Sequence, residues 1–197
     1  MSSESVRSPE LLHRASSRLL IVDVQEKLVA TLGAATRERL VGSCRFLAEG
    51  AKLLGVPIAI TEQYPQGLGP TDSALREFSS ERPAKKRFSC VECLGWPTAV
   101  DAVDDRFQIV VAGMEAHVCV LQTVLDLLAS GYQVYVAVDA IASRHEIDQR
   151  VALERLANAG AIPTTAEGVL FEWAETSAAA EFKQLSGLVK ARDVTNL

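Results

Sequence analysis

The chain has 197 residues, of which 48% are hydrophobic and 23% charged, and its formal net charge is −5. This composition is ordinary for a globular protein of one domain, and no apolar run approaches the roughly 20 residues that span a membrane. The negative charge argues against a nucleic-acid-binding surface, which is normally basic.

Residues 1–17 are polar and lack the apolar core of a secretory signal. We interpret them as an N-terminal tail, either mobile or packed as an arm on a neighbouring subunit, and we assign residues 18–197 to one domain.

Strands and helices are expected to alternate from residue 18 onward. In the first half of the chain we predict a strand over 18–24, a helix over 36–54, a strand over 56–61, an irregular segment over 62–72, a short helix over 73–79, a short strand over 84–89 and a helix over 97–103.

The stretch 107–131 has the clearest pattern in the chain. The β-branched run from Ile109 to Val111 is typical of a buried parallel strand, and Gly113 ends it. From Cys119 the apolar residues follow a helical period, and Gly131 stands where a helix C-terminal glycine is expected. The unit therefore predicts a strand, a tight turn and a helix.

The remaining chain continues the alternation, with a strand over 133–139, a helix over 145–160, a strand over 161–166 and a helix over 178–190. This order implies right-handed crossovers and a parallel sheet. We therefore expect an α/β protein with three αβα layers and a Rossmann-like central sheet of about six strands. A G-x-G-x-x-G fingerprint is absent after the first strand, which argues against dinucleotide binding.

Ligands of such sheets bind at the carboxyl ends of the strands. This rule selects Asp23, Glu62 with Gln63, the turn 113–119 and Asp139. Within that turn Cys119 begins a helix, whose unpaired N–H groups favour a thiolate. The alternatives are a cysteine that only fills the core and an Asp23 that only caps a turn. We interpret Asp139 as structural, capping the loop before the next helix.

The cysteines Cys44, Cys90, Cys93 and Cys119 lack the spacing of a disulfide framework, and free thiols indicate a reducing compartment such as the cytoplasm. Cys90 and Cys93 form a C-x-x-C pair without the further ligands that zinc requires. We expect no metal site, and a redox pair remains an alternative.

Three separated motifs resemble the isochorismatase-like cysteine hydrolases, and the similarity covers nearly the whole chain after the tail. They read Leu-Ile-Val-Asp-Val-Gln over 20–25, Lys-Lys-Arg-Phe-Ser over 85–89 and Gly-Met-Glu-Ala-His-Val-Cys over 113–119. The segment 61–69 is similar to the branch called isochorismatase domain-containing proteins. The resemblance implies the isochorismatase-like hydrolase fold.

Amidases of this family use an Asp–Lys–Cys triad, which implies a base at Asp23, a cation at Lys85 and a nucleophile at Cys119. The family spacing, Lys-x-x-aromatic-Ser or Thr, selects Lys85, with Lys86 as the alternative register. A lysine there is expected to lower the pKa of the thiol. Carbonyl attack by the thiol would form a thioester, which water hydrolyses.

A cis peptide in the family corresponds to Met114–Glu115, where the N–H groups of Glu115 and Cys119 are expected to bind an oxyanion. His117 as a general base is the alternative.

We expect Gln25, Glu62, Gln63, Tyr64 and Phe88 to line the substrate pocket, with a purely structural loop as the alternative for 62–64. The family's nicotinamidases bind a metal through histidines after the second strand, where this chain reads Thr-Glu-Gln-Tyr over 61–64. We therefore expect no cofactor, a small amide-like or related carbonyl substrate, and a homo-oligomer without nucleic-acid or membrane partners. The alternative function is a catalytically weak ligand-binding or redox-sensing module.

Overall fold

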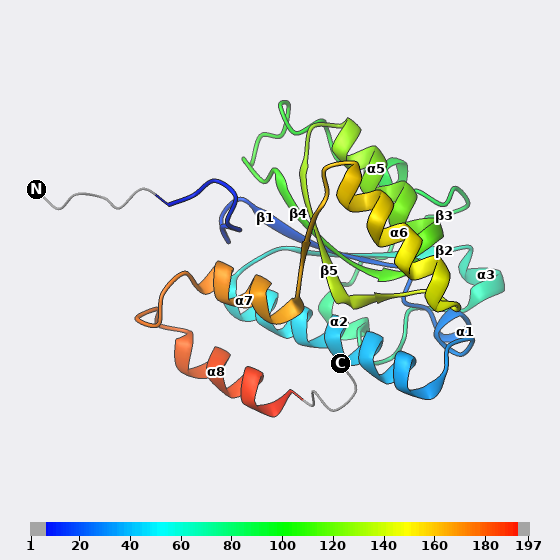
Figure 1. Ribbon diagram of the computed structural model, residues 1–197, viewed down its shortest axis with the longest axis horizontal. Coiled ribbons are helices and arrows are strands. Elements are labelled where there is room, and N and C mark those ends of the chain that lie inside the picture. Colours follow the sequence, from blue (N-terminus) through cyan, green and yellow to red (C-terminus); the bar gives the residue numbers. More distant parts are fainter. Residues whose placement is uncertain (1–6, 193–197) are drawn as a thin grey trace, which may run out of the picture.

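Six parallel strands form one sheet in the computed structural model, which describes residues 7–192 (Figure 1). They are β1 (Ser17–Val22), β2 (Ile58–Gln63), β3 (Ala84–Lys85), β4 (Gln108–Met114), β5 (Gln133–Ala142) and β6 (Ile162–Thr164). Their order across the sheet is β3-β2-β1-β4-β5-β6. The chain builds one half outward from β1, then crosses back and builds the other half from β4. The predicted parallel sheet is confirmed.

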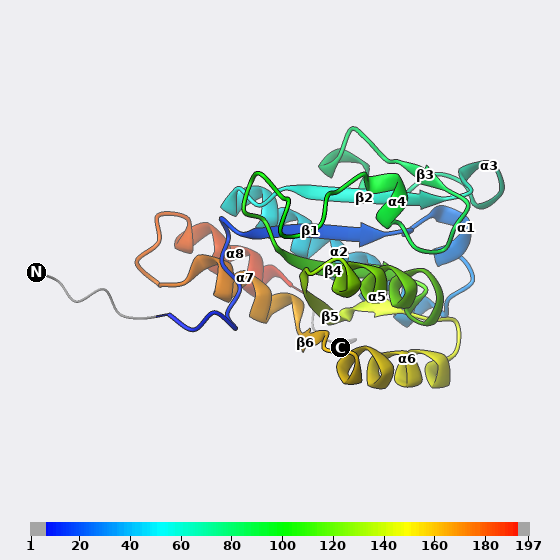
Figure 2. The same ribbon diagram turned by 90° about the horizontal axis from the view of Figure 1, so that it is seen from above.

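Helices cover both faces of this sheet and make the three layers (Figure 2). One face carries α2 (Ala34–Leu54), α7 (Ala166–Ala174) and α8 (Phe182–Ala191), and the other carries α4 (Val91–Leu94), α5 (Leu121–Ala129) and α6 (Glu146–Asn158). Short helical turns complete the described chain: α1 (Glu26–Val29), α3 (Pro65–Leu68), the 3₁₀ turn η1 (Arg76–Phe78) and the π turn η2 (Ala116–Val120).

The side chains of β1 divide between the two faces because successive residues of a strand point in opposite directions. Leu19 and Ile21 pack in the core beneath α2, whereas Leu20 and Val22 pack in the core beneath α5. All four are fully buried. Burial on both faces explains why this strand is a continuous apolar run without polar alternation.

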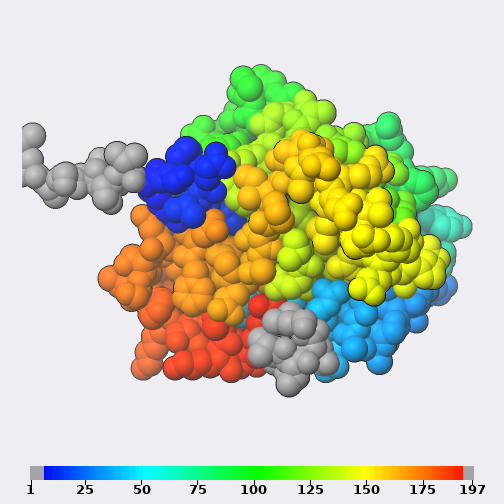
Figure 3. All heavy atoms as spheres, viewed as in Figure 1, coloured from blue at the N-terminus to red at the C-terminus, as the bar shows by residue number. Residues whose placement is uncertain are grey.

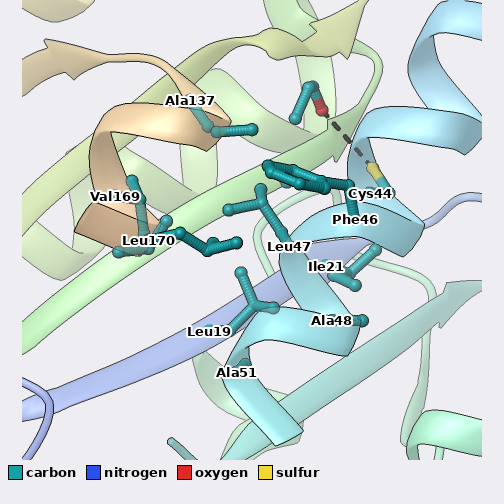
Figure 4. Packing of buried hydrophobic residues seen from close by; sticks show 14 of the residues in the cluster. Leu19, Ile21, Cys44, Phe46, Leu47, Ala48, Ala51, Ala137, Val169 and Leu170 are labelled. Carbon is teal, nitrogen blue, oxygen red and sulfur yellow. Dashed lines mark hydrogen bonds between the residues drawn. The ribbon is translucent and has the colours of Figure 1, made fainter. Parts of the chain in front are cut away.

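Helix α2 packs directly against α7 on the first face. Figure 4 shows Leu170 of α7 beside Leu47 of α2, with Leu19 of β1 below them. Gly50 allows this close approach, because a Cβ at that position would meet the side chain of Leu170.

Asp139 joins β5 to three helices of that face. Its Oδ1 accepts the N–H of Ala166 at the start of α7 (2.8 Å), and its Oδ2 pairs with Nη2 of Arg192 beyond α8 (2.6 Å). Its carbonyl accepts Nη1 of Arg39 from α2 (2.8 Å). A structural role, the interpretation given to Asp139 from the sequence, agrees with these contacts.

The N-terminal segment 7–16 packs on its own chain. The N–H of Leu12 donates to Oε2 of Glu172 in α7 (2.7 Å), and the Leu12 side chain is fully buried. Arg7 donates to the Glu172 carbonyl (2.6 Å). In the space-filling view this blue segment lies against the orange surface of α7 (Figure 3). The rest of the predicted tail, residues 1–6, lies outside the described residues.

Several predicted elements differ from the observed ones. The predicted helix over 97–103 is wrong, because this segment is a series of turns. The N–H of Ala99 donates to the Ser130 carbonyl (2.9 Å), and the Tyr132 hydroxyl donates to the Pro97 carbonyl (2.6 Å). The predicted strand over 84–89 shortens to two residues, and β5 extends to Ala142, so Asp139 lies within the strand. Helix α7 was not predicted.

Candidate functional site

The carboxyl ends of β1, β2, β3 and β4 bring together polar residues from three distant parts of the sequence. The strand order reverses between β1 and β4, and the crevice at such a reversal is the usual ligand site of an open parallel sheet. Asp23 follows β1, Lys85 ends β3, and Cys119 lies in the turn after β4. The three residues of the predicted triad therefore share one edge.

A tight turn after β1 aims the carboxylate of Asp23. The residue has a φ of 52°, and the N–H of Gln25 donates to its carbonyl (2.8 Å). Aspartate tolerates this left-handed conformation better than most residues do. The side chain is fully buried, and its Oδ1 accepts the hydroxyl of Thr61 from β2 (2.8 Å). One carboxylate oxygen is thus held in place while the other faces Lys85.

The ammonium of Lys85 is surrounded by three acceptors. Nζ donates to Oδ2 of Asp23 (2.6 Å), to Oε1 of Gln63 (2.7 Å) and to the carbonyl of Phe88 (2.8 Å). The side chain is only 3% exposed, whereas the neighbouring Lys86 is exposed. This geometry favours Lys85 over the alternative register at Lys86.

Cys119 is buried in the core beneath α5, where its thiol interacts electrostatically with Asp23 and with the Lys85 ammonium. It belongs to the π turn η2, which precedes α5. The Glu115 carbonyl accepts the N–H groups of Val118 and Val120 (both 3.1 Å) and so closes this wider turn. A π turn is uncommon and often found at functional sites.

Burial raises the pKa of the Cys119 thiol to about 12. The negative charge of Asp23 acts in the same direction, while the positive charge of Lys85 opposes both. Lys85 lowers the pKa of the thiol, as expected, but desolvation raises it by more, so the net pKa lies above the ordinary value. Burial therefore favours the thiol form of Cys119.

The turn 114–117 presents its backbone to this edge, and its charged side chain points elsewhere. The peptide bond between Met114 and Glu115 is cis. The Glu115 carboxylate pairs with Arg144, whose Nε lies 2.6 Å from Oε1. The Glu115 side chain is thus engaged by a partner, which leaves its backbone N–H as the group that we predict at the oxyanion position.

Three of the predicted pocket residues, Gln25, Glu62 and Gln63, have their polar side-chain atoms bonded to protein groups. Gln25 donates to the carbonyls of Gln63 (3.0 Å) and Gly69 (2.6 Å), and it accepts the N–H of Gln63 (2.7 Å). Glu62 accepts both the N–H and the hydroxyl of Thr71 (2.7 Å each). These contacts hold the loop 63–71 over the strand ends.

Tyr64 and Phe88 differ from those three, because each aromatic side chain is about half exposed. Both belong to segments that hold Lys85: the N–H of Tyr64 donates to the Lys85 carbonyl (2.9 Å), and Phe88 supplies an acceptor for Nζ. They remain predicted substrate contacts.

His117 is directed toward other partners. Its Nδ1 lies 2.9 Å from the Ser143 hydroxyl, and its Nε2 lies 4.0 Å from Glu115 and 3.8 Å from Asp148. Since both ring nitrogens face these groups, the geometry does not favour His117 as the base for Cys119.

The other thiols are free. The Cys90 sulfur lies 3.3 Å from the Thr123 hydroxyl, and the Cys93 sulfur donates to the Cys90 carbonyl (3.2 Å). Burial raises the pKa of the Cys90 thiol to about 12. Within residues 7–192, no group of three or more His, Cys, Asp and Glu side chains is arranged to hold a metal ion.

Thr61 was not singled out from the sequence, although its hydroxyl fixes one oxygen of Asp23. The available signal in the sequence was its place as the polar residue that ends the predicted strand 56–61. A buried hydroxyl needs a hydrogen-bond partner, and Asp23 at the end of the adjacent strand is the one it finds.

Comparisons with known proteins agree with this fold. The isochorismatase domain matches residues 17–168. Isochorismatase domain-containing protein 2 from Bos taurus is 38% identical over 175 residues, covering 89% of this chain and 83% of that protein. The structure of MAR1 ribonuclease from Caenorhabditis elegans shares 34% identity with a TM-score of 0.82, covering 95% and 96% of the two chains.

A more distant structure shows the same fold. The YcaC gene product from Escherichia coli, described as an octameric hydrolase of unknown specificity, is 20% identical with a TM-score of 0.80, covering 97% of this chain and 95% of that one.

Proposed function

The chain belongs to the isochorismatase family of hydrolases, and from this premise we propose that it is a metal-independent cysteine hydrolase of a small amide-like or related carbonyl substrate. The observation that supports the proposal is the buried Asp23–Lys85 pair, both members of which act electrostatically on the Cys119 thiol. Nucleophile, base and cation thus meet in a site largely shielded from water.

The first step is attack by the Cys119 sulfur on the substrate carbonyl carbon. Because the thiol is protonated at neutral pH, Asp23 accepts its proton as the carbon–sulfur bond forms. The negative charge that develops on the carbonyl oxygen is stabilised by the backbone N–H groups of Glu115 and Cys119. Lys85 stabilises the charge of the attacking sulfur.

The second step is collapse of the tetrahedral intermediate. Asp23 returns the proton to the leaving nitrogen, the carbon–nitrogen bond breaks, and a thioester on Cys119 remains. Water then attacks the thioester while Asp23 accepts its proton. The acid product leaves, and the thiol regains a proton from Asp23, so the site returns to its starting state.

Replacement of Cys119 by alanine tests this chemistry. We expect turnover of small amides and ureido compounds to fall by about 10³-fold or more, the usual cost of losing a nucleophile that acts as a unit with its base. Ammonia or amine release measures turnover, and mass spectrometry of acid-quenched reactions detects the thioester. Because the side chain is small, the melting temperature of the variant should stay close to that of the wild type.

Cys93→Ala is the matched control, because it removes a thiol that is bonded to the Cys90 carbonyl outside the triad. Its turnover should equal that of the wild type. Full activity in Cys119→Ala would contradict the mechanism. A wild-type protein that binds small amides without turning them over would instead support the ligand-binding alternative.

RNA cleavage is a second candidate, and the similarity to the C. elegans protein named MAR1 ribonuclease is the observation that favours it. The net charge of −5 and the buried base argue against an extended polyanion at this site. Incubation of labelled single-stranded RNA with wild type and Cys119→Ala decides: cleavage by wild type alone would move the assignment to RNA.

We also propose that the protein forms a homo-oligomer, with support from the octamer described for the E. coli relative. Light scattering on the eluting protein should give a multiple of the 21.2 kDa chain mass. A mass equal to one chain at micromolar concentration would overturn this proposal.

None of the helices within residues 7–192 combines the length and the apolar character that a membrane crossing requires.

A further inference from the structure

Gln63 makes contacts that belong to the triad itself. Its Oε1 accepts the Lys85 ammonium (2.7 Å), while its Nε2 donates to the Lys86 carbonyl (2.9 Å). The second contact fixes which end of the amide faces Lys85, because a carbonyl can only accept. Gln63 is also buried, with 9% of its surface exposed, so its side chain is committed to protein partners.

The backbone of Gln63 is fixed as well. Its N–H donates to Oε1 of Gln25, and its carbonyl accepts Nε2 of the same side chain. Gln25 is itself fully buried. A chain of hydrogen bonds therefore runs from Gln25 through Gln63 to Lys85 and on to Asp23, and the Asp23–Lys85 pair interacts electrostatically with the Cys119 thiol. Buried networks in which every member is satisfied give rigid, well-defined positions.

The Gln63 oxygen also affects the electrostatics of the Lys85 ammonium that it accepts. A neutral acceptor on Nζ stabilises the charged ammonium in a site that disfavours charge. The remaining acceptors are Asp23 and the Phe88 carbonyl, which leaves Gln63 as the neutral side chain among the three. Loss of the Gln63 oxygen would leave one buried N–H of the Lys85 ammonium without an acceptor.

We propose that Gln63 is a positioning residue, which holds Lys85 charged and directed toward Cys119, and that it does not bind substrate. This inference rests on the proposed function and replaces the prediction of Gln63 as a pocket residue. The reactivity of the Cys119 thiol is the property that Gln63 should control, through Lys85.

The test measures the rate of Cys119 alkylation by iodoacetamide between pH 7 and pH 10, with peptide mapping to separate Cys119 from Cys93. This readout needs no substrate. We expect Gln63→Met, which has a similar shape but lacks the acceptor, to react about tenfold more slowly at pH 8, the effect of a one-unit rise in thiol pKa. Gln63→Glu should also react more slowly, because it adds a negative charge near the thiol.

Two comparisons separate positioning from a general effect on folding. Gln108→Met removes another buried glutamine, one that contacts His13 and Leu11 far from the triad, and should leave the alkylation profile unchanged. In the double variant Gln63→Met with Lys85→Ala, the rate should equal that of Lys85→Ala alone, because Gln63 acts through the lysine.

The inference is overturned if Gln63→Met is alkylated as fast as wild type, or if its effect adds fully to that of Lys85→Ala. Where Gln63→Met does not fold, Gln63→Asn decides, since its shorter amide withdraws the acceptor from Lys85 without adding charge, and alkylation as fast as in the wild type would overturn the inference. The proposed function fails in a different way: Lys85→Ala would then leave the Cys119 alkylation profile unchanged.

Discussion

At the scale of single residues, the state of the nucleophile is set by competition between burial and charge. Desolvation and the negative charge of Asp23 raise the pKa of the Cys119 thiol by more than the positive charge of Lys85 lowers it. A helix start was expected to favour a thiolate, yet the cysteine lies near the end of a π turn that precedes α5. The proposed mechanism therefore passes the thiol proton to Asp23 during attack and does not require a thiolate formed beforehand.

Three buried thiols make the stability of the protein sensitive to alkaline pH. Burial raises the pKa of Cys44, Cys90 and Cys119 in the folded chain, whereas the unfolded value is about 8.5. The unfolded chain therefore releases these protons first as the pH rises. The stability that the protonated thiols contribute is full below pH 8.5 and declines above it, by about 1 kcal/mol per thiol between pH 8.5 and 9.5.

Urea unfolding at these two pH values measures the effect. Cys44→Ala, which removes a thiol remote from the triad, should lose about 1 kcal/mol less than wild type over the same interval. Its absolute stability will be lower because of the small cavity, so only the change with pH is compared. Equal changes in the two proteins would show that Cys44 does not titrate as its burial indicates.

At the scale of elements, the meeting of β1 and β4 depends on Gly113. This residue pairs with Val22 in register and has a φ of 120°. A Cβ there would overlap the Val22 carbonyl oxygen and backbone nitrogen. Because Val22 precedes Asp23 and Gly113 precedes the cysteine turn, this close contact sets the spacing between base and nucleophile.

We expect Gly113→Ala to lower the free energy of unfolding by about 3 kcal/mol or more, through strain at positive φ and a backbone clash. Gly42→Ala is the matched control, since Gly42 is exposed within α2 and nothing lies within 4 Å of an added Cβ. That substitution should raise the free energy by about 0.5–1 kcal/mol. Urea unfolding of both variants gives the values, and a stable, active Gly113→Ala protein would contradict the prediction.

The elements that the sequence did not predict correctly share one physical reason. Helix α7 begins after a strand of three residues. It is capped by the Thr165 hydroxyl, which accepts the N–H of Gly168, but Thr165 was assigned to the predicted strand. The segment 97–103 has two alanines but otherwise weak helix formers, and tertiary bonds to Ser130 and Tyr132 hold it in turns. Local propensity decides an element only where long-range contacts do not override it.

At the scale of the whole molecule, the candidate site was predictable because parallel sheets place strand ends together. Asp23, Lys85 and Cys119 are separated by more than 30 residues along the chain, yet the rule for carboxyl ends and the family motifs select all three. Sequence does not give the direction of a side chain within a loop. Gln25, Glu62 and Gln63 were therefore assigned to a pocket, whereas their polar atoms hold the loop and the lysine.

The residue at which the folded domain begins is also a property of the whole molecule. A domain starting at residue 18 was predicted because the first 17 residues are polar. Leu12 nevertheless lies fully buried in the core with α2 and α7, and its N–H is bonded to Glu172. The described part of the segment thus contributes apolar surface to the core, which a polar composition does not reveal.

We predict that Leu12→Ala lowers the free energy of unfolding by about 2–4 kcal/mol, the usual cost of truncating a buried leucine. Leu11→Ala provides the control, because the neighbouring side chain is 40% exposed, and its effect should stay within about 0.5 kcal/mol. Urea unfolding at pH 7 compares the two. Equal and small effects would place residue 12 outside the folded unit and restore the boundary at residue 18. A large effect at Leu12 alone would mean that the sheet needs this segment to close the core beside α7.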